Sequence, residues 1–348
     1  MVTLKDVAKK ARVSVATVSY VLNGNHHQVS TGTIEKVMSV VDELNYKPNN
    51  IAKSLRTSKT KIIGIIAEDL TVFNTPKIID GIGEFFEQHG YNLVLNNLRL
   101  SNRIGIHYED AVKYKSRIKE LIDNLVSRET DGLIYLGVHF RDIEGIVTKI
   151  EKPVVYTYCF MGDHKSGWVN YKEEEASYNV MEYLINLGHR SIGIITGVEE
   201  SISTQKRLKG CLNSIDKHSD VIGRDSVFIH GGDWTYESGY SAAMELLKNE
   251  SPLSAVFAMS DPMAIGVMDA ARDSGLQVPR DISVIGFDNQ ACSQYSYPKL
   301  TTVEIPLKEM GRKSAQLLLN LIEEKKSGVD LNIELDCQLI ERESVRSR

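Results

Sequence analysis

The chain has 348 residues, of which 42% are hydrophobic and 25% are charged, and its formal net charge is −5. This length and composition predict two or three domains with a substantial core. They exclude a membrane-spanning protein because no apolar run is long enough, and the N-terminus is too polar for a secretory signal, so we expect a cytoplasmic protein with no membrane partner.

The charge is divided unevenly along the chain. Residues 1–59 carry nine Lys or Arg against four Asp or Glu, whereas the rest of the chain carries 32 against 42. The N-terminal segment therefore has a net charge of +5 and the remainder has −10. The negative total argues against nucleic acid as a partner, but the basic segment taken alone is typical of phosphate binding.

Two short helices joined by a tight turn are predicted for the first 23 residues. Thr3 and Asp6 have the spacing of a capping box. Leu4, Val7, Ala8 and Ala11 then recur at helical spacing and form one apolar face of the first helix. Ser14 is placed to cap the second helix. The residues of that helix that face inward are Val18, Val21 and Leu22.

A third helix completes a small core. Ser30 is expected to cap it, and its apolar residues keep the helical spacing. They are Ile34, Val37, Val41 and Leu44. We therefore predict an all-α helix-turn-helix head over residues 1–46. The small outer face of the second helix fits a DNA major groove, although ordinary amphipathic helix pairs also produce this pattern.

The segment after the third helix adds more specific motifs. They are Thr-Leu-Lys-Asp-Val-Ala at residues 3–8, Val-Ala-Thr-Val-Ser at 15–19, Val-Leu-Asn-Gly at 21–24, Leu-Asn-Tyr-Lys-Pro-Asn at 44–49 and Ala-Lys-Ser-Leu at 52–55. With these motifs the chain resembles the LacI/GalR family of bacterial transcription regulators. The resemblance implies that residues 47–60 form a hinge that orders on DNA, with Leu55 wedged into the minor groove beside Ala52.

The resemblance also assigns the DNA-contacting residues. In the head they are Thr3, Lys5, Val15, Ala16, Thr17, Ser19, Tyr20 and Asn23, and in the hinge Asn49, Ala52, Lys53 and Leu55. Two residues depart from the family pattern. Arg12 replaces a turn glycine, which predicts a strained positive φ or a phosphate contact. Tyr20 replaces an arginine of many members, so the operator need not match theirs.

From Lys61 onward, short β-rich runs alternate with amphipathic segments. Strands are predicted at 62–67, 91–96, 132–136, 153–158, 191–196, 226–230, 255–259 and 282–287, with helices such as 76–89 and 173–187 between them. Such alternation predicts parallel sheets covered by helices. Two such halves resemble the family's periplasmic-binding-protein-like α/β core, over residues 61–348. We expect lobe 1 at about 61–159 and 291–320, and lobe 2 at about 160–290 and 321–348.

The resemblance places a small-molecule effector in the cleft between the lobes, at the carboxyl ends of the strands. Arg207, Asp288 and Trp234 match residues that hold a sugar in relatives, through charged hydrogen bonds and an aromatic face. Other candidates follow the strands. They are Phe73, Asn74, Tyr158, Ser201, Ser203, Ser260 and Asp261. Tyr158 and Ser260 depart from the family pattern, which indicates an effector unlike the familiar hexoses. For Trp234, Arg207 and Asp288, buried packing or a structural ion pair is the alternative.

Segment 98–109 is longer than the fold requires between a strand and a helix. A solvated loop and a partner-protein site both fit it. No nucleotide-binding, nucleophile-elbow or metalloprotease motif is present, and the four cysteines lack the spacing of metal ligands. We therefore expect no enzyme, cofactor or metal.

The sequence thus predicts a ligand-responsive repressor of carbohydrate uptake or catabolism genes. One helix-turn-helix reads only half a site, so the predicted unit is a homodimer on a near-palindromic double-stranded operator. Two alternatives stay open: a regulator that responds to a purine, a phosphosugar or a phosphocarrier protein, and a sugar-binding protein without regulatory output.

Overall fold

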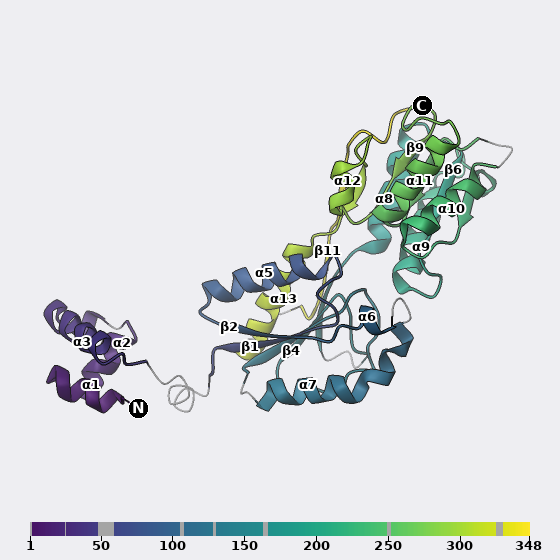
Figure 1. Cartoon of the computed structure of the whole chain (residues 1–348). Helices are drawn as coiled ribbons and strands as arrows, with labels where there is room; N and C mark the ends of the chain where they lie inside the picture. Colours follow the sequence, from purple (N-terminus) through teal and green to yellow (C-terminus); the bar gives the residue numbers. More distant parts are fainter. Residues whose placement is uncertain are drawn as a thin grey trace. The chain divides into compact units, whose positions relative to one another are not determined.

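The computed structural model describes residues 2–24, 26–47, 59–104, 108–127, 130–162, 166–248, 252–324 and 330–348. The chain forms two compact units, Met1–Lys61 and Ile62–Arg348. We call the first unit the head and the second the core (Figure 1). Among the described residues, no helix combines the length and apolar character needed to cross a membrane.

The head contains the three predicted helices, α1 (Leu4–Ala11), α2 (Val15–Leu22) and α3 (Thr31–Glu43), with a 3₁₀ turn, η1 (His26–Gln28), before α3. The predicted capping box is confirmed: the Thr3 amide donates to Asp6 Oδ2 over 2.8 Å, and the Asp6 amide donates to Thr3 Oγ1 over 3.4 Å. Val7, Val18 and Val37 are completely buried, one from each helix. The apolar periodicity therefore closes one small core, as predicted.

Two details of the head refine the expectations. Arg12 adopts φ 54°, in the left-handed region, so the turn has the strained conformation that the missing glycine predicts. Ser14 caps α2 through the Thr17 amide, over 3.0 Å. Ser30 occupies the N-cap position of α3 but makes no capping bond to the backbone, because its hydroxyl lies 2.9 Å from the Thr33 hydroxyl instead.

Lobe 1 of the core is built on a six-stranded parallel sheet in the order β11-β5-β4-β3-β1-β2. Its strands are β1 (Ile62–Ala67), β2 (Asn92–Asn97), β3 (Gly132–Leu136), β4 (Val154–Thr157), β5 (Gly167–Tyr171) and β11 (Asn332–Leu335). Helices α5 (Thr75–Gln88) and α13 (Leu307–Ile322) cover one face, and α7 (Lys115–Ser127) covers the other (Figure 1). Alternate residues of β1 point to the two faces, with Ile65 toward α5 and Ile66 toward α7.

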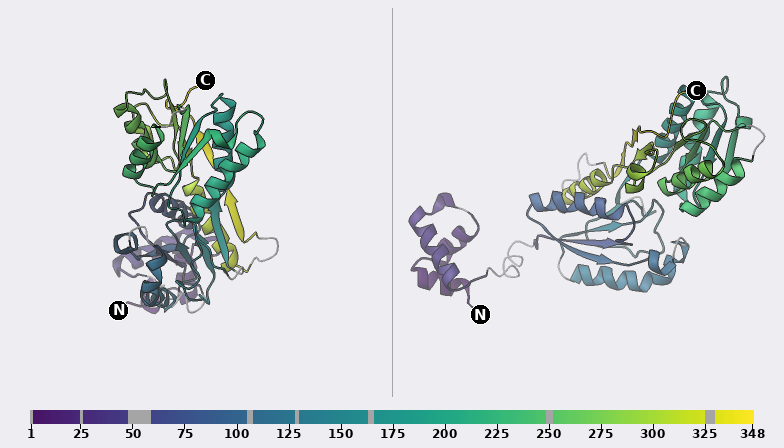
Figure 2. Two further views of the ribbon diagram at one scale, coloured as in Figure 1. Left: turned by 90° about the vertical axis from the view of Figure 1, so that its right-hand side faces the viewer. Right: turned by 45° about the horizontal axis from the view of Figure 1, so that its top comes forward.

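Lobe 2 is built on a four-stranded parallel sheet in the order β7-β6-β8-β9. The strands are β6 (Ile192–Ile195), β7 (Val227–His230), β8 (Ala255–Ala258) and β9 (Ser283–Ile285). Helix α8 (Glu173–Asn186) packs on α9 (Ile202–Lys217), and α10 (Tyr236–Leu246) packs on α11 (Asp261–Asp273). The short helix α12 (Ala291–Tyr295) lies beside α11. A 3₁₀ turn, η3 (Arg224–Ser226), precedes β7. Strands β10 (Thr302–Glu304) and β12 (Gln338–Ile340) form an antiparallel pair at its margin. The two lobes are visible in both views of Figure 2.

The lobe boundaries differ from those we predicted near residues 160, 290 and 320. Strands β5 and β11 belong to the sheet of lobe 1, and α12 packs on α11 of lobe 2. The chain therefore crosses between the lobes at Lys172, between Glu304 and Leu307, and between Leu335 and Gln338. The prediction missed β5 because no helix separates it from β4, so the β–α alternation on which we relied is interrupted there. It missed β11 because half of its residues are exposed, as befits an edge strand.

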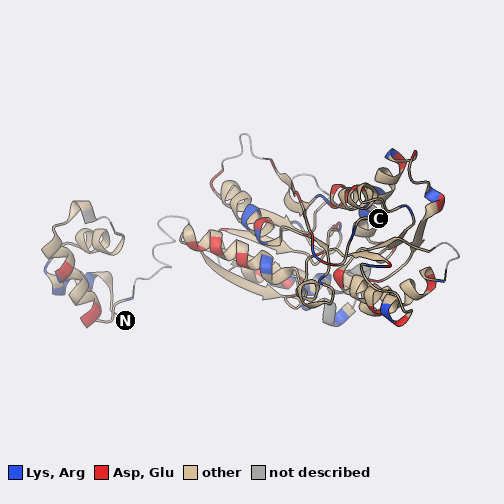
Figure 3. Ribbon diagram, turned by 90° about the horizontal axis from the view of Figure 1, so that it is seen from above, with Lys and Arg blue, Asp and Glu red and all other residues tan. Residues whose placement is uncertain are grey.

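The connection between β2 and α7 is more structured than a solvated loop. It contains α6 (Ser101–Ile104) and a 3₁₀ segment, η2 (Tyr108–Tyr114), on either side of residues that lie outside the described ones. Leu98 and Leu100 are buried within it, as is Ala111. Acidic and basic residues are interspersed along the helices of the core (Figure 3), with ion pairs three or four residues apart such as Lys119–Asp123.

Helices α5 and α13 approach each other through glycine. A Cβ atom on Gly81 would lie 2.0 Å from the Lys308 carbonyl oxygen, and one on Gly311 would lie 2.0 Å from the Ile78 carbonyl oxygen. The backbones of the two helices are thus in direct contact, and any larger side chain must separate them. Gly83, in the same helix α5, would meet only Leu93 at 3.8 Å.

We therefore predict opposite effects of alanine at two glycines of one helix. Gly81→Ala should lower the free energy of unfolding by about 2 kcal/mol, because overpacking outweighs the gain in helix propensity. Gly83→Ala should raise it by up to about 1 kcal/mol, since only the propensity term operates. Urea unfolding of both variants measures the difference, and equal stabilities would contradict the close approach.

Candidate DNA-binding surface and effector cavity

The outer face of α2 exposes apolar side chains. Val15 and Tyr20 are each 41% exposed, and Ala16 lies between them on the surface. Lys5 is also exposed. An exposed face of small apolar residues and one tyrosine, on the second helix of a helix-turn-helix, matches the surface that enters a DNA major groove.

The other predicted DNA contacts of the head are engaged in local hydrogen bonds. The Thr3 hydroxyl donates to Asp6 over 2.7 Å, and the Thr17 hydroxyl lies 2.8 Å from that of Ser14. The Asn23 amide donates to the Ser19 carbonyl oxygen over 2.7 Å. These bonds hold the ends of the helices. The predicted hinge contacts, Asn49, Ala52, Lys53 and Leu55, lie outside the described residues.

The core contains a cavity of about 750 Å³ between its lobes. Its walls come from the segments that follow the carboxyl ends of strands in both sheets, where ligands of open α/β sheets bind. The structure brings eight of the ten predicted effector residues into these walls: Phe73, Tyr158, Ser201, Ser203, Arg207, Trp234, Ser260 and Asp288.

Asn74 and Asp261 do not line the cavity. Both are buried, and the Asn74 amide donates to the Val138 carbonyl oxygen over 2.7 Å. The Asp261 carboxylate accepts from the Thr302 hydroxyl over 2.5 Å and from the Gln290 backbone N–H over 2.6 Å. These hydrogen bonds engage both side chains and fix the start of α5 and strand β10. Asn74 and Asp261 therefore have a structural role next to the cavity.

Arg207 is the most constrained residue of the cavity. It lies on α9, is 3% exposed, and donates to the Met259 carbonyl oxygen and, over 2.7 Å, to the Tyr171 hydroxyl. The carboxylates of Asp288 and Glu173 lie 3.6 and 3.7 Å from its nitrogens. Its guanidinium also stacks 3.8 Å from the Phe287 ring centre. Two carboxylates thus neutralise the buried charge, so the structural ion pair that the sequence left as an alternative is present, on a side chain that also lines the cavity.

Three residues of the cavity have left-handed backbones: Tyr158 with φ 59°, Trp234 with φ 76° and Asp288 with φ 107°. Each follows a strand, and none is glycine. A positive φ costs such residues on the order of 1 to 3 kcal/mol, and this strain is concentrated at functional sites. The Trp234 ring lies against Gly197, where a Cβ atom would come within 2.0 Å of it.

Sequence reasoning missed most of the lobe 1 wall. Val138, His139, Arg141 and Asp142 follow β3 directly, so the rule that assigned the other candidates could have found them. Arg141 pairs with the buried Glu68, through bonds of 2.9 and 2.5 Å. Burial, together with the Arg141 charge, lowers the pKa of His139 well below its usual value, so its imidazole is neutral.

The rest of the missed wall comes from less regular segments. These residues are Val72, Val112, Glu144, Ile146, Val198, Glu200, Ile202 and Gln290. Val112 belongs to η2, far along the chain from any strand end, and no sequence signal places it at a ligand. Among the described residues, no cluster of His, Cys, Asp and Glu could hold a metal ion.

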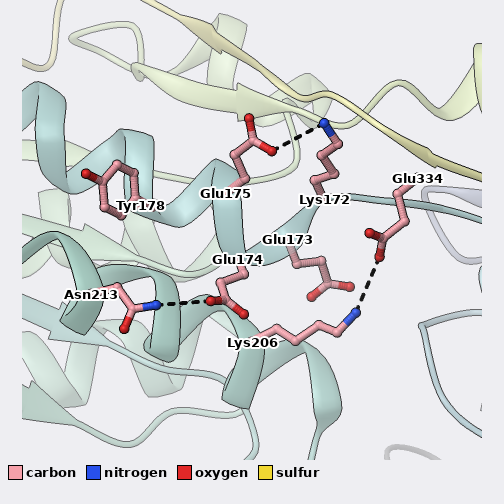
Figure 4. A pocket seen from close by; sticks show the side chains of 8 residues that line it. All are labelled: Lys172, Glu173, Glu174, Glu175, Tyr178, Lys206, Asn213 and Glu334. Carbon is pink, nitrogen blue, oxygen red and sulfur yellow. Dashed lines mark hydrogen bonds and ion pairs between the residues drawn. The ribbon is translucent and has the colours of Figure 1, made fainter.

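A second pocket, of about 400 Å³, lies where β5 passes into α8 (Figure 4). Its side chains face one another: Lys206 lies 3.6 Å from Glu334, and Asn213 donates to Glu174 over 3.0 Å. Lys206 also lies 4.5 Å from the Phe140 ring centre. Since Lys206 belongs to lobe 2 and its two partners to lobe 1, this pocket is an ion-paired seam between the lobes.

Comparison with known proteins identifies the chain. Residues 3–49 match the bacterial regulatory proteins of the lacI family, and residues 181–345 match a periplasmic binding protein-like domain. HTH-type transcriptional repressor CytR of Escherichia coli strain K12 is 32% identical over 99% of this chain and 96% of its own. The chain belongs to the LacI family. It is therefore a DNA-binding transcriptional regulator, as the sequence motifs predicted.

Solved structures agree with this assignment. The lac repressor dimer bound to operator and the anti-inducer ONPF matches 99% of both chains, with a TM-score of 0.77 and 28% identity. The complex of the transcriptional regulator CelR with cellobiose matches 99% of this LacI-family chain and 100% of its own, with a TM-score of 0.66 and 28% identity. The predicted fold, a helical head with a two-lobed α/β core, is confirmed.

The cavity of this LacI-family regulator makes its stability depend on pH. Burial raises the pKa of Asp288 to about 6, even though Arg207 and Gln290 favour its ionised form. A carboxyl whose pKa is raised on folding stabilises the protein at low pH, and that stability is lost as the pH rises through the folded pKa. Asp216, in contrast, has its pKa lowered by the Arg224 hydrogen bond.

Asp288→Asn should therefore gain stability relative to the parent as the pH rises from 4 to 7, by on the order of 2 kcal/mol. Asp216→Asn is the control and should show the opposite sign. Urea unfolding at several pH values measures both differences. If the difference in the free energy of unfolding between Asp288→Asn and the parent stays constant with pH, the raised pKa of Asp288 is contradicted.

Proposed function

We propose that this regulator is a dimeric repressor that binds a near-palindromic operator through α2 and the hinge, and responds to a small molecule in the interlobe cavity. A sugar or a related compound is the proposed effector, and genes of carbohydrate uptake or catabolism are the proposed targets. The observation that carries the proposal is the cavity itself, because it lies where open α/β sheets bind ligands and is lined by three residues with strained backbone conformations.

Two similarities support the sugar assignment. The lac repressor structure combines a dimer, an operator and an anti-inducer, and CelR binds cellobiose. In this chain, Trp234 offers an aromatic face while Asp288 and Ser260 offer hydroxyl partners in the same wall. Sugars bind through that combination of stacked ring and polar contacts.

One alternative is a regulator that responds to a purine, a phosphosugar or a phosphocarrier protein. The second alternative is a sugar-binding protein without regulatory output. The second alternative leaves the DNA-binding head without a role. A bacterial regulator acts where the DNA is, so we place the protein in the cytoplasm, and we propose no catalytic turnover and no cofactor.

Sequencing the DNA that the protein retains from its genome would give the operator and the neighbouring genes. Fluorescence anisotropy with that operator would then show which sugars change DNA affinity. A protein that retains no specific DNA, or whose operator affinity no sugar, nucleobase or phosphosugar alters, would contradict the proposal.

The exposed face of α2 gives a matched test of DNA recognition. Tyr20→Ala should weaken binding to the recovered operator by about tenfold, because a base contact in the groove is worth 1 to 3 kcal/mol. Met38→Ala, on α3 and also 41% exposed, is the control and should bind like the parent. Equal losses in anisotropy titrations of the two variants would show that α2 does not read the DNA.

The core also offers a test of the dimer. Tyr295, at the end of α12, and Tyr297, two residues later, are 83% and 96% exposed. Large exposed aromatic residues mark protein interfaces. Tyr297→Asp should raise the dimer dissociation constant about tenfold or more in sedimentation equilibrium. Val221→Asp, at a 43% exposed residue of lobe 2, is the control. A parent protein that sediments as a monomer would contradict the dimer.

A further inference from the structure

The turn between α1 and α2 holds a strained residue whose side chain makes no polar contact within the described part of the protein. Arg12 ends α1 with φ 54° and ψ 45°, a left-handed conformation that glycine adopts without strain. Its backbone N–H donates to the Lys9 carbonyl oxygen over 3.3 Å, which a glycine could do equally well. The guanidinium is exposed, and among the described residues it has no hydrogen bond or ion pair. Folding alone therefore does not require arginine at this position.

Arg12 extends a row of basic residues along α1. Lys5 and Lys9 are four residues apart on the same side of the helix, and Arg12 follows Lys9 by three residues. All three are exposed, and neither lysine ammonium is paired within the part of the chain that the structure describes. We call Lys5, Lys9 and Arg12 the basic row. The Lys10 ammonium, in contrast, is paired with Glu43 of α3 over 2.6 Å.

The place of α1 in a helix-turn-helix directs these charges at the DNA backbone. The second helix of the motif lies in the major groove, and the first helix crosses the backbone. Because the turn with Arg12 joins the two helices, it lies where the groove meets the phosphates. The one acidic residue of α1, Asp6, does not compete, since its carboxylate accepts from the Thr3 amide and hydroxyl over 2.8 and 2.7 Å.

We propose that the basic row binds phosphates of one DNA strand beside each half-site, with Arg12 as its anchor, and that the strained turn serves this contact. Arginine suits the position because its planar guanidinium can donate two parallel hydrogen bonds to one phosphate. Phosphate contacts carry no sequence information, so the row fixes the head on the duplex while α2 reads the bases. The proposal rests on the proposed binding of the operator through α2 and adds two contacts, from Lys9 and Arg12.

Arg12→Gly tests the anchor because it removes the charge and the strain together. Loss of one phosphate contact per head should weaken operator binding about tenfold, and the slope of log affinity against log salt should fall by about two for the dimer. An unrelated duplex of the same length should lose affinity by the same factor. Fluorescence anisotropy with the full-length protein at several KCl concentrations measures both duplexes.

The same substitution should stabilise the head, because glycine adopts the left-handed conformation of residue 12 without strain. We expect amide hydrogen exchange in α1 and α2 of the full-length variant to be about two- to fivefold slower than in the parent, with exchange in the core unchanged. A variant whose head exchanges more slowly cannot owe a loss of DNA affinity to unfolding.

Three further variants separate the charge from the strain. Arg12→Lys retains the charge and the left-handed residue, so it should keep most of the salt dependence. Lys9→Gln and Lys10→Gln are a matched pair, since each removes one positive charge from neighbouring residues of α1. Lys9→Gln should lower the slope as Arg12→Gly does, whereas Lys10→Gln should keep the parent slope because Lys10 is already paired with Glu43.

The outcomes separate this inference from the proposed function. The inference is overturned if Arg12→Gly keeps the parent's affinity and salt dependence, if it weakens operator binding alone, or if its head exchanges no more slowly. It is also overturned if Lys10→Gln lowers the slope as much as Lys9→Gln. In each case, loss of operator binding in Tyr20→Ala would still support recognition through α2. A parent protein that binds no operator would overturn both.

Discussion

The buried guanidinium of Arg207 is the charge on which the arrangement of the core depends. Taking an arginine out of water costs several kcal/mol unless hydrogen bonds and opposite charges compensate it. Its partners come from both lobes, because Tyr171 lies on β5 of lobe 1 while Met259 and Asp288 follow strands of lobe 2. The Tyr171 hydroxyl lies 3.2 Å from that of Tyr158, so the same network reaches a second strand of lobe 1. Any change in the position of the lobes must therefore preserve or replace these partners.

This network also explains the strain around the cavity. Tyr158, Trp234 and Asp288 have positive φ angles that the surrounding strands and helices must hold in place. With these backbone conformations, all three side chains line the cavity beyond the ends of their strands. Gly197 permits the Trp234 ring to lie directly on the backbone, and no larger residue fits between them. The aromatic face is thus fixed before any ligand binds.

The sequence was sufficient for the parts of the structure that follow local rules. Capping residues and helical spacing predicted α1, α2 and α3, and alternating patterns predicted β1 and β3 with their observed bounds. Arg207 and Asp288 were predicted through the family resemblance. These features were accessible because a cap or a strand end is defined by a few neighbouring residues.

The features that were missed depend on contacts between distant segments. Strand β11 is recognisable only through its pairing with β5, and the lobe boundaries follow from that pairing. Asp261 matched a family ligand position, yet Thr302 and Gln290 occupy its oxygens, and both lie far from it in the sequence. Val112 reaches the cavity because Ala111 is buried beneath it, which no periodicity in the connection indicates.

Because residues of both lobes line the cavity, ligand binding has a physical route to lobe position. A ligand can shift an equilibrium between two arrangements only by the difference in its affinity for them. A sugar that touched lobe 2 alone would bind equally whether the lobes were apart or together, and would shift nothing however tightly it bound. A ligand that also touches residues of lobe 1 such as Val138 loses those contacts when the lobes separate, so the free energy of the lobe 1 contacts is what favours the closed arrangement. Specificity for the part of the ligand that faces lobe 1 and the strength of the response then have the same origin.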